Sequence, residues 1–261
     1  MNRKAAELPF HTVPSVFHPF LQDAKIYDSS CSPAARVYFI DKDCGYYLKT
    51  AARHSLETES KLTGFFHSKQ LAAEVIAYES LERDWMLTAR IPGEDCLHSM
   101  YLEDPIRLCD KTGELLRMLH STAYEGCPVP NRTADYLAAA ARNYSCKAYD
   151  LHLFPDNWGY QTPEEAWHVV ECYGSCLKTD TLLHGDYCLP NIMLDNWHFS
   201  GFLDLDTGGI GDRHVDLFWG AWTLQYNLKT DRYRDRFLDA YGRNDIDEDL
   251  FRVIAAIEVF L

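Results

Sequence analysis

Hydrophobic and polar positions divide the chain into two parts with different periodicities. In the first third, short apolar runs alternate with polar turns, which is the pattern of β-strands. A single stretch with helical spacing, Leu56–Phe66, lies between the second and third runs. The predicted strands are Arg36–Ile40, Gly45–Thr50, Val75–Tyr78 and Trp85–Arg90. This part therefore predicts two strand pairs and one helix.

After Pro92-Gly93 the apolar spacing becomes mainly helical. Asp104 before Pro105, and Thr162 before Glu165, are helix-start signals. The expected helices are Asp104–His120, Thr133–Cys146, Thr162–Leu177, Asp216–Tyr226, Asp231–Tyr241 and Asp247–Leu261. We place the boundary at this Pro-Gly pair, which gives an N-terminal lobe of residues 1–91 and a C-terminal lobe of residues 92–261.

One short stretch interrupts the helical part. The apolar run Ile192–Leu194 predicts a strand, the turn Asp195–His198 follows it, and Phe202–Leu205 predicts a second strand. Because adjacent hairpin strands return the chain to its starting edge, we expect the second strand to bring Asp204 near Asn191.

The residues around this hairpin are those that phosphoryl transfer needs. His184-Gly185-Asp186 is followed by Asn191 five residues after the aspartate. One carboxylate can orient a substrate hydroxyl, while an amide and a second carboxylate hold Mg²⁺ on nucleotide phosphates. Protein kinases carry these parts as H-R-D-x-x-x-x-N with an Asp on the next hairpin. Here the pattern is H-G-D-x-x-x-x-N followed by Asp204.

With glycine in the second position, and with DLDTGGIGDRHVD over Asp204–Asp216, the stretch resembles the aminoglycoside 3'-phosphotransferase-like family. This family lies in the aminoglycoside phosphotransferase and choline kinase branch of the protein-kinase-like fold. The resemblance implies an α+β, two-lobed fold with a small β-sheet N-lobe and a larger, mainly helical C-lobe. It also implies an ATP- and Mg²⁺-dependent enzyme that phosphorylates a hydroxyl of a small cationic molecule, foremost the 3'-hydroxyl of an aminoglycoside. GTP in place of ATP stays open.

The resemblance assigns roles to matching residues. Asp186 is the catalytic carboxylate, and Asn191 and Asp204 are the Mg²⁺ ligands. Lys49 contacts the nucleotide phosphates and pairs with a glutamate of the following helix. Matching the family pattern selects Glu59 for this pair, although the sequence leaves Glu57 open.

The remaining nucleotide contacts belong to the N-terminal lobe. Strand alternation puts Tyr47 on the same face as Lys49, where its ring can meet adenine. The resemblance places a Ser-rich phosphate loop at Ser30 and Ser32, and backbone contacts to adenine at Ala89 and Ile91.

Substrate recognition departs from the family in several places. The resemblance assigns Asp156, Asn157, Glu258 and the C-terminal residue Leu261 to the substrate. Elsewhere acids or an arginine of the family are replaced, at Gly159, Leu189, Tyr226-Asn227 and Asp206-Thr207. Fewer acids weaken binding of a polyamine, so a smaller amino alcohol or a choline-like acceptor stays an alternative.

A nucleotide-binding pseudokinase is a second alternative. A binuclear metallohydrolase, with His184, Asp186, Asp212 and His214 as ligands, is a third.

The composition of the chain restricts the kinds of molecule that it is expected to bind. A formal net charge of −14 disfavours nucleic acid and anionic membranes and favours a cationic ligand. The nine cysteines form no C-x-x-C pair, which indicates reduced thiols rather than a disulfide framework. We see neither a secretory signal nor an apolar run of membrane-spanning length, and we infer no obligate protein partner. These features predict a cytoplasmic protein.

Overall fold

The computed structural model describes residues 4–31, 33–149 and 159–261, and it divides into two compact units. The first unit takes in the described residues up to Gly93 together with Met193–Asp206. The second takes in Glu94–Ile192 and Thr207–Leu261. The expected lobes, 1–91 and 92–261, differ from these units in two respects: the first unit continues to Gly93, and it also contains the segment Met193–Asp206. Phe202 explains the second difference, since its N–H donates to the carbonyl of Leu71.

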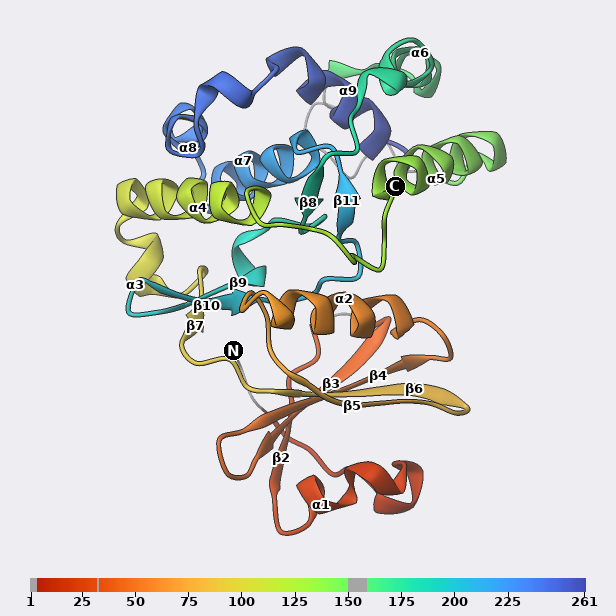
Figure 1. The fold of residues 1–261 in the computed structure, drawn as a ribbon, viewed down its shortest axis with the longest axis vertical. Helices are drawn as coiled ribbons and strands as arrows, with labels where there is room; N and C mark the ends of the chain where they lie inside the picture. Colours follow the sequence, from red (N-terminus) through yellow and green to blue (C-terminus); the bar gives the residue numbers. More distant parts are fainter. Residues whose placement is uncertain (1–3, 32, 150–158) are drawn as a thin grey trace. The chain divides into compact units, whose positions relative to one another are not determined.

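A six-stranded antiparallel sheet, in the order β1-β2-β3-β4-β6-β5, forms most of the first unit (Figure 1). Helix α1, His18–Leu21, precedes β2, and helix α2, Glu57–Ser68, follows β4. The strands are β1 Lys4–Ala5, β2 Lys25–Asp28, β3 Ala35–Asp41, β4 Tyr46–Ala52, β5 Val75–Ser80 and β6 Arg83–Ala89. The four expected strands and the helix are present, whereas β1 and β2 were not predicted.

Alternation along β4 decides which of its residues face α2. Leu48 packs in a cluster that contains Phe17 of the N-terminal segment. Ala51, on the opposite face, packs with Leu56 at the start of α2 and with Met86. Lys49 lies directly opposite Met86 in the β4–β6 pair, so its side chain leaves the sheet on the α2 face.

The second unit is mainly helical. Its helices are α3 Ser99–Leu102, α4 Pro105–His120, α5 Arg132–Cys146, α6 Pro163–Tyr173, α7 His214–Leu228, α8 Arg234–Tyr241 and α9 Glu248–Glu258. The six expected helices are all present with shifted ends. Asp104 and Thr162 cap α4 and α6 through their side chains, as their sequence signals predicted. No described helix combines the length and apolar character that crossing a membrane requires.

Short strands complete the second unit. Strand β8, Thr181–Leu183, pairs antiparallel with β11, Gly209–Gly211, and β7 is Glu94–Asp95. Leu183 of β8 packs in the core with Val215 and Phe218 of α7 and with residues of α9. This core fixes the position of the end of β8, from which the His184-Gly185-Asp186 segment continues.

The hairpin after Asn191 has a different second strand from the predicted one. Strand β9 is Ile192–Asp195, but β10 is His198–Phe202 rather than Phe202–Leu205. Asn196 and Trp197 both have positive φ, 47° and 69°, which makes a tight two-residue turn and starts the return strand early. Asp204 lies beyond β10 with φ of 52°. The apolar run was misread because buried residues continue past the strand's end.

Candidate active site

Lys49 and Glu59 form an ion pair within the first unit. The Lys49 Nζ donates to both carboxylate oxygens of Glu59, each at 2.8 Å, and to Asp204 Oδ1 at 2.9 Å. Glu57 instead accepts from Lys61, at 2.6 Å on the exposed side of α2. Of the two glutamates that the sequence left open, Glu59 is therefore the one that Lys49 contacts.

Burial and charge act in opposite directions on this pair. Burial lowers the pKa of Lys49, but the carboxylates of Glu59 and Asp204 outweigh it and raise that pKa above its ordinary value. Burial raises the pKa of Glu59, and the contact with Lys49 opposes this. The lysine is thus a fixed positive charge, while the Asp204 side chain keeps 60% of its surface exposed.

Asp186 and Asn191 come together in the second unit. After Leu183 the chain leaves β8, passes through Asp186 and makes a single 3₁₀ turn over Leu189–Asn191. The Asn191 Nδ2 donates to Asp186 Oδ2 at 2.8 Å and to the Asp186 carbonyl at 3.0 Å. The spacing of five residues therefore closes a small loop in which the amide orients the carboxylate.

A buried carboxylate at the start of α7 binds the backbone of this loop. Asp216 accepts from the backbone N–H groups of His184 and Gly185 at 2.8 and 2.7 Å. It also bonds to the Nε2 of His120 at 3.0 Å. Asp216, in the first turn of α7, thus organises the loop.

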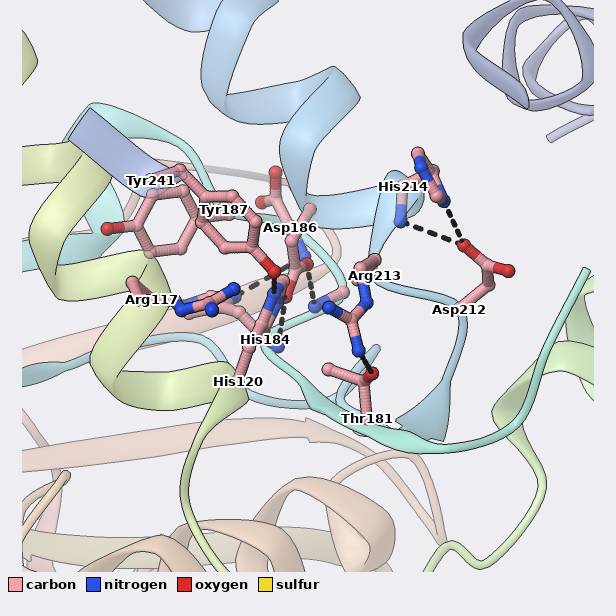
Figure 2. A network of polar contacts seen from close by, with 12 residues as sticks. Arg117, His120, Thr181, His184, Asp186, Tyr187, Asp212, Arg213, His214 and Tyr241 are labelled. Carbon is pink, nitrogen blue, oxygen red and sulfur yellow. Dashed lines mark hydrogen bonds and ion pairs between the residues drawn. The ribbon is translucent and has the colours of Figure 1, made fainter. Parts of the chain in front are cut away.

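His120 extends this network to Tyr241 (Figure 2). The two residues are 2.9 Å apart, between the His120 Nδ1 and the Tyr241 hydroxyl. Burial lowers the pKa of His120 although Asp216 opposes it, so the ring is neutral and donates to Asp216 through Nε2. The sequence did not reveal the roles of His120 and Tyr241, because no local pattern joins positions so far apart.

Gly185 explains the second position of the H-G-D motif. Its φ is 87°, which favours glycine. A Cβ at this position would lie 2.1 Å from the carbonyl oxygen of Thr207. A side chain is therefore excluded both by the backbone conformation and by the neighbouring loop.

Two residues of the metallohydrolase alternative, Asp212 and His214, bond to each other. The His214 ring bonds through Nδ1 to Asp212 Oδ1 at 2.6 Å, and its Nε2 accepts from the N–H of Asp247 at 2.9 Å. Asp212 also accepts from the N–H of Lys178. Within residues 4–31, 33–149 and 159–261, no group of three or more His, Cys, Asp or Glu side chains is placed to hold a metal. This geometry gives the hydrolase alternative no support.

The other predicted nucleotide contacts lie along the sheet of the first unit. Ser30 stands in the turn between β2 and β3, where its Oγ accepts from the N–H of Val37 at 3.0 Å. Tyr47 packs against the Phe39 ring, with centroids 5.3 Å apart. The Ala89 N–H donates to the carbonyl of Glu74, and Ile91 is buried. Ser32 lies outside the described residues.

The predicted substrate residues are described only in part, since Asp156 and Asn157 lie outside the described residues. Glu258 is buried, and its Oε1 accepts from the Tyr136 hydroxyl and, at 2.9 Å, from the Trp219 Nε1. Burial raises the pKa of Glu258 to about 7, and the charge of Asp186 adds to this rise. Leu261 is 48% exposed.

Known proteins resemble this chain, one of them over 99% of its length. The sequence pattern of the phosphotransferase enzyme family matches residues 32–253. A probable aminoglycoside 3'-phosphotransferase of Lactococcus lactis subsp. lactis (strain IL1403) is 49% identical over 260 residues, which are 99% of each chain. An aminoglycoside 3'-phosphotransferase of Niallia circulans is 28% identical over 177 residues, 68% of this chain and 67% of the relative.

Solved structures share the fold. A crystal structure of an aminoglycoside 3'-phosphotransferase of type VIII superposes with a TM-score of 0.75 at 21% identity, over 91% of this chain and 94% of that one. A Streptomyces rimosus aminoglycoside phosphotransferase in complex with ADP and streptomycin gives 0.71 at 19% identity, over 86% and 90%. The predicted α+β, protein-kinase-like fold is confirmed. With the matched family pattern and the 49% identical relative, the chain belongs to the phosphotransferase enzyme family.

Proposed function

We propose that this enzyme transfers the γ-phosphoryl group of ATP to the 3'-hydroxyl of an aminoglycoside, with Mg²⁺ as its metal. The observation that carries the proposal is the pairing of Lys49 with both Glu59 and Asp204. A strand lysine held by a helix glutamate is the phosphate-binding arrangement of kinases. The 49% identical relative, named a probable aminoglycoside 3'-phosphotransferase, supports the choice of acceptor.

Asn191 and Asp204 fit Mg²⁺ by their chemistry. Carboxylate and amide oxygens are the hard ligands that this ion prefers. The Asp204 carboxylate is 60% exposed, and the Asn191 amide nitrogen is committed to Asp186, so its oxygen is the atom for a metal. When bound, Mg²⁺ neutralises the charge of the nucleotide phosphates.

Lys49 adds a second fixed positive charge for the phosphates. Two acidic partners keep it protonated, and Glu59 holds its ammonium group on the α2 face of the sheet. The turn at Ser30 and Ser32 would cover the phosphates. The Tyr47 ring and the backbone of Ala89 and Ile91 would bind adenine.

Asp186 orients the acceptor. Its carboxylate accepts a hydrogen bond from the substrate hydroxyl, whose oxygen forms a bond to the γ-phosphorus as the bond to the β–γ bridging oxygen breaks. The hydroxyl proton passes to the Asp186 carboxylate. Asn191 fixes the rotamer of this carboxylate, and Asp216 fixes the backbone on which it stands.

The acceptor is cationic in this proposal. The net charge of −14 attracts such a ligand. Among the predicted substrate residues, Glu258 is a buried carboxyl group whose pKa is raised in part by the charge of Asp186. Asp156, Asn157 and Leu261 complete the predicted substrate set. The acids missing at Leu189 and Tyr226-Asn227 predict a narrower range of aminoglycosides than a broad resistance enzyme accepts. We place the reaction in the cytoplasm, where ATP is supplied, without an obligate protein partner.

A screen of acceptors tests the proposal. ATP consumption is measured with Mg²⁺ and kanamycin- or neomycin-type aminoglycosides, and with choline and simple amino alcohols as the competing class. We expect turnover with at least one aminoglycoside, and NMR of the product should show phosphorus coupled to the 3' carbon. Phosphorylation of an amino alcohol alone would remove the aminoglycoside and leave a small-molecule kinase. Nucleotide binding without any turnover would favour a pseudokinase.

A further inference from the structure

Asp84 is a buried carboxylate in the first unit that none of the roles above uses. It lies on β6, opposite Ala51 of β4, and none of its surface is exposed. It accepts four hydrogen bonds at 2.7–3.0 Å. Two come from hydroxyls of the neighbouring strand, Tyr78 and Ser80, and two come from the backbone N–H groups of His54 and Leu56.

His54 and Leu56 belong to the short connection between β4 and α2. His54 has a φ of 66°, a conformation that costs free energy in a residue with a side chain. Leu56 is the N-cap of α2 and forms no capping bond with its own side chain. Asp84 therefore supplies the acceptor that the helix start lacks, and it holds the strained connection in place.

This connection joins the two members of the ion pair. Lys49 stands three residues before the end of β4, and Glu59 stands in the first turn of α2. Both elements are stiff, so the distance between the lysine and the glutamate depends on the connection. Burial would raise the pKa of Asp84, but its hydrogen bonds, from Ser80 foremost, hold that pKa below the ordinary value. The carboxylate is thus charged, and its charge stabilises the N-terminus of the helix.

We propose that Asp84 is a positioning residue for the nucleotide site: it clamps the β4–α2 connection and thereby keeps Glu59 in register with Lys49. The effect on ATP kinetics rests on the proposed function, whereas the effect on the position of Glu59 relative to Lys49 does not. When the clamp is lost, α2 moves relative to β4, Glu59 leaves the ammonium group, and Lys49 loses its largest charge partner.

The reactivity of Lys49 reports the clamp without any assay of catalysis. The Lys49 side chain is only 19% exposed and Glu59 holds its ammonium group, so acetic anhydride reaches the amine poorly while the pair is closed. Asp84→Asn should release the side chain and increase the acetylation rate of Lys49 several-fold, measured by mass spectrometry at fixed pH. Glu59→Gln is the positive control and should give at least the same increase.

Two further variants separate positioning from general loss of stability. Ser80→Ala removes one bond to Asp84 but leaves both bonds to the connection. Val253→Ala opens space in the core of the other unit. Both should lower the melting temperature while the Lys49 acetylation rate stays unchanged. An Asp84→Asn rate equal to that of these controls would overturn the proposal.

Kinetics then join the clamp to the reaction. Asp84→Asn should raise the KM for ATP about tenfold and leave the KM for the acceptor within about twofold, a split that a merely less stable enzyme would not show. Increased Lys49 labelling with an unchanged KM for ATP would support the positioning role of Asp84. The same result would contradict the role of the Lys49–Glu59 pair in nucleotide binding. Should Asp84→Asn not fold, hydrogen exchange on the unsubstituted chain decides. The His54 and Leu56 amides should be protected as strongly as those of α2, and rapid exchange would overturn the clamp.

Discussion

The Asp216 carboxylate accepts the backbone N–H of His184 at 2.8 Å, although the two residues are 32 positions apart. Asp216 lies in the first turn of α7, and His184 begins the loop that carries Asp186. A side chain of one element thus fixes the backbone of another just before the predicted catalytic carboxylate. Activity should depend on this contact even though Asp216 is fully buried.

Asp216→Asn should reduce kcat at least tenfold and destabilise the fold by about 1–3 kcal/mol. The amide can accept only through one atom, so a buried N–H group of His184 or Gly185 loses its partner. Steady-state kinetics and thermal unfolding measure the two effects. Asp231→Asn, an exposed change of the same type, should alter neither. Wild-type kcat in Asp216→Asn would contradict the role of this bond.

Gly185→Ala should almost abolish turnover, because a Cβ would lie 2.1 Å from the Thr207 carbonyl oxygen and the loop must move. Gly126→Ala is a matched control. Its φ, 82°, is close to the 87° of Gly185, but no atom lies within 4 Å of the added Cβ. The control carries the conformational strain without the collision, so it should lose stability and retain kcat. Equal kcat values for the two variants would show that the collision is harmless.

Lys49→Ala should raise the KM for ATP by tenfold or more, and it should lower the melting temperature because the buried Glu59 carboxylate loses its partner. Glu59→Gln should reproduce part of the loss. Glu57→Gln, on the same helix but paired with Lys61, should leave the KM for ATP unchanged. An effect of the Glu57 change that matches the Glu59 change would place the functional pair elsewhere.

The buried carboxyl of Glu258 should make stability depend on pH. Its pKa is raised from 4.5 to about 7, so the folded state holds a proton that the unfolded state has already lost. Stability from this group is complete below about pH 4.5 and is lost as the pH rises to about 7. The loss amounts to at most about 3 kcal/mol. Melting temperatures of the wild type and Glu258→Gln, compared between pH 5 and pH 8, measure it. Parallel curves would mean that Glu258 is already ionised at pH 5.

The local parts of this fold could be predicted from the sequence. Caps at Asp104 and Thr162 fixed the starts of helices, because each signal acts within one turn. Strand alternation predicted that Tyr47 and Lys49 share one face of β4, and the structure adds that this is the α2 face. The early return strand at His198 was missed, since two non-glycine residues with positive φ carry no strong sequence signal.

Contacts between residues far apart in the sequence limited how much of the candidate site could be predicted. The sequence motif names Asp186 and Asn191 together, and in the structure the Asn191 Nδ2 bonds to the Asp186 carboxylate. The support behind it was not predictable, because His120 and Tyr241 reach Asp216 only through tertiary packing. Asp84 was missed for the same reason. Its four partners lie on two separate segments, and a single aspartate in a strand pattern does not identify them.

The central claim is that Asp186 acts on the acceptor hydroxyl and not on the nucleotide. The most direct measurement is single-turnover phosphoryl transfer to an accepted aminoglycoside by Asp186→Asn, with ATP affinity determined by calorimetry on the same sample. We predict a rate at least about a hundredfold below that of the wild type, with ATP affinity within a few fold. A transfer rate close to that of the wild type would contradict the assignment.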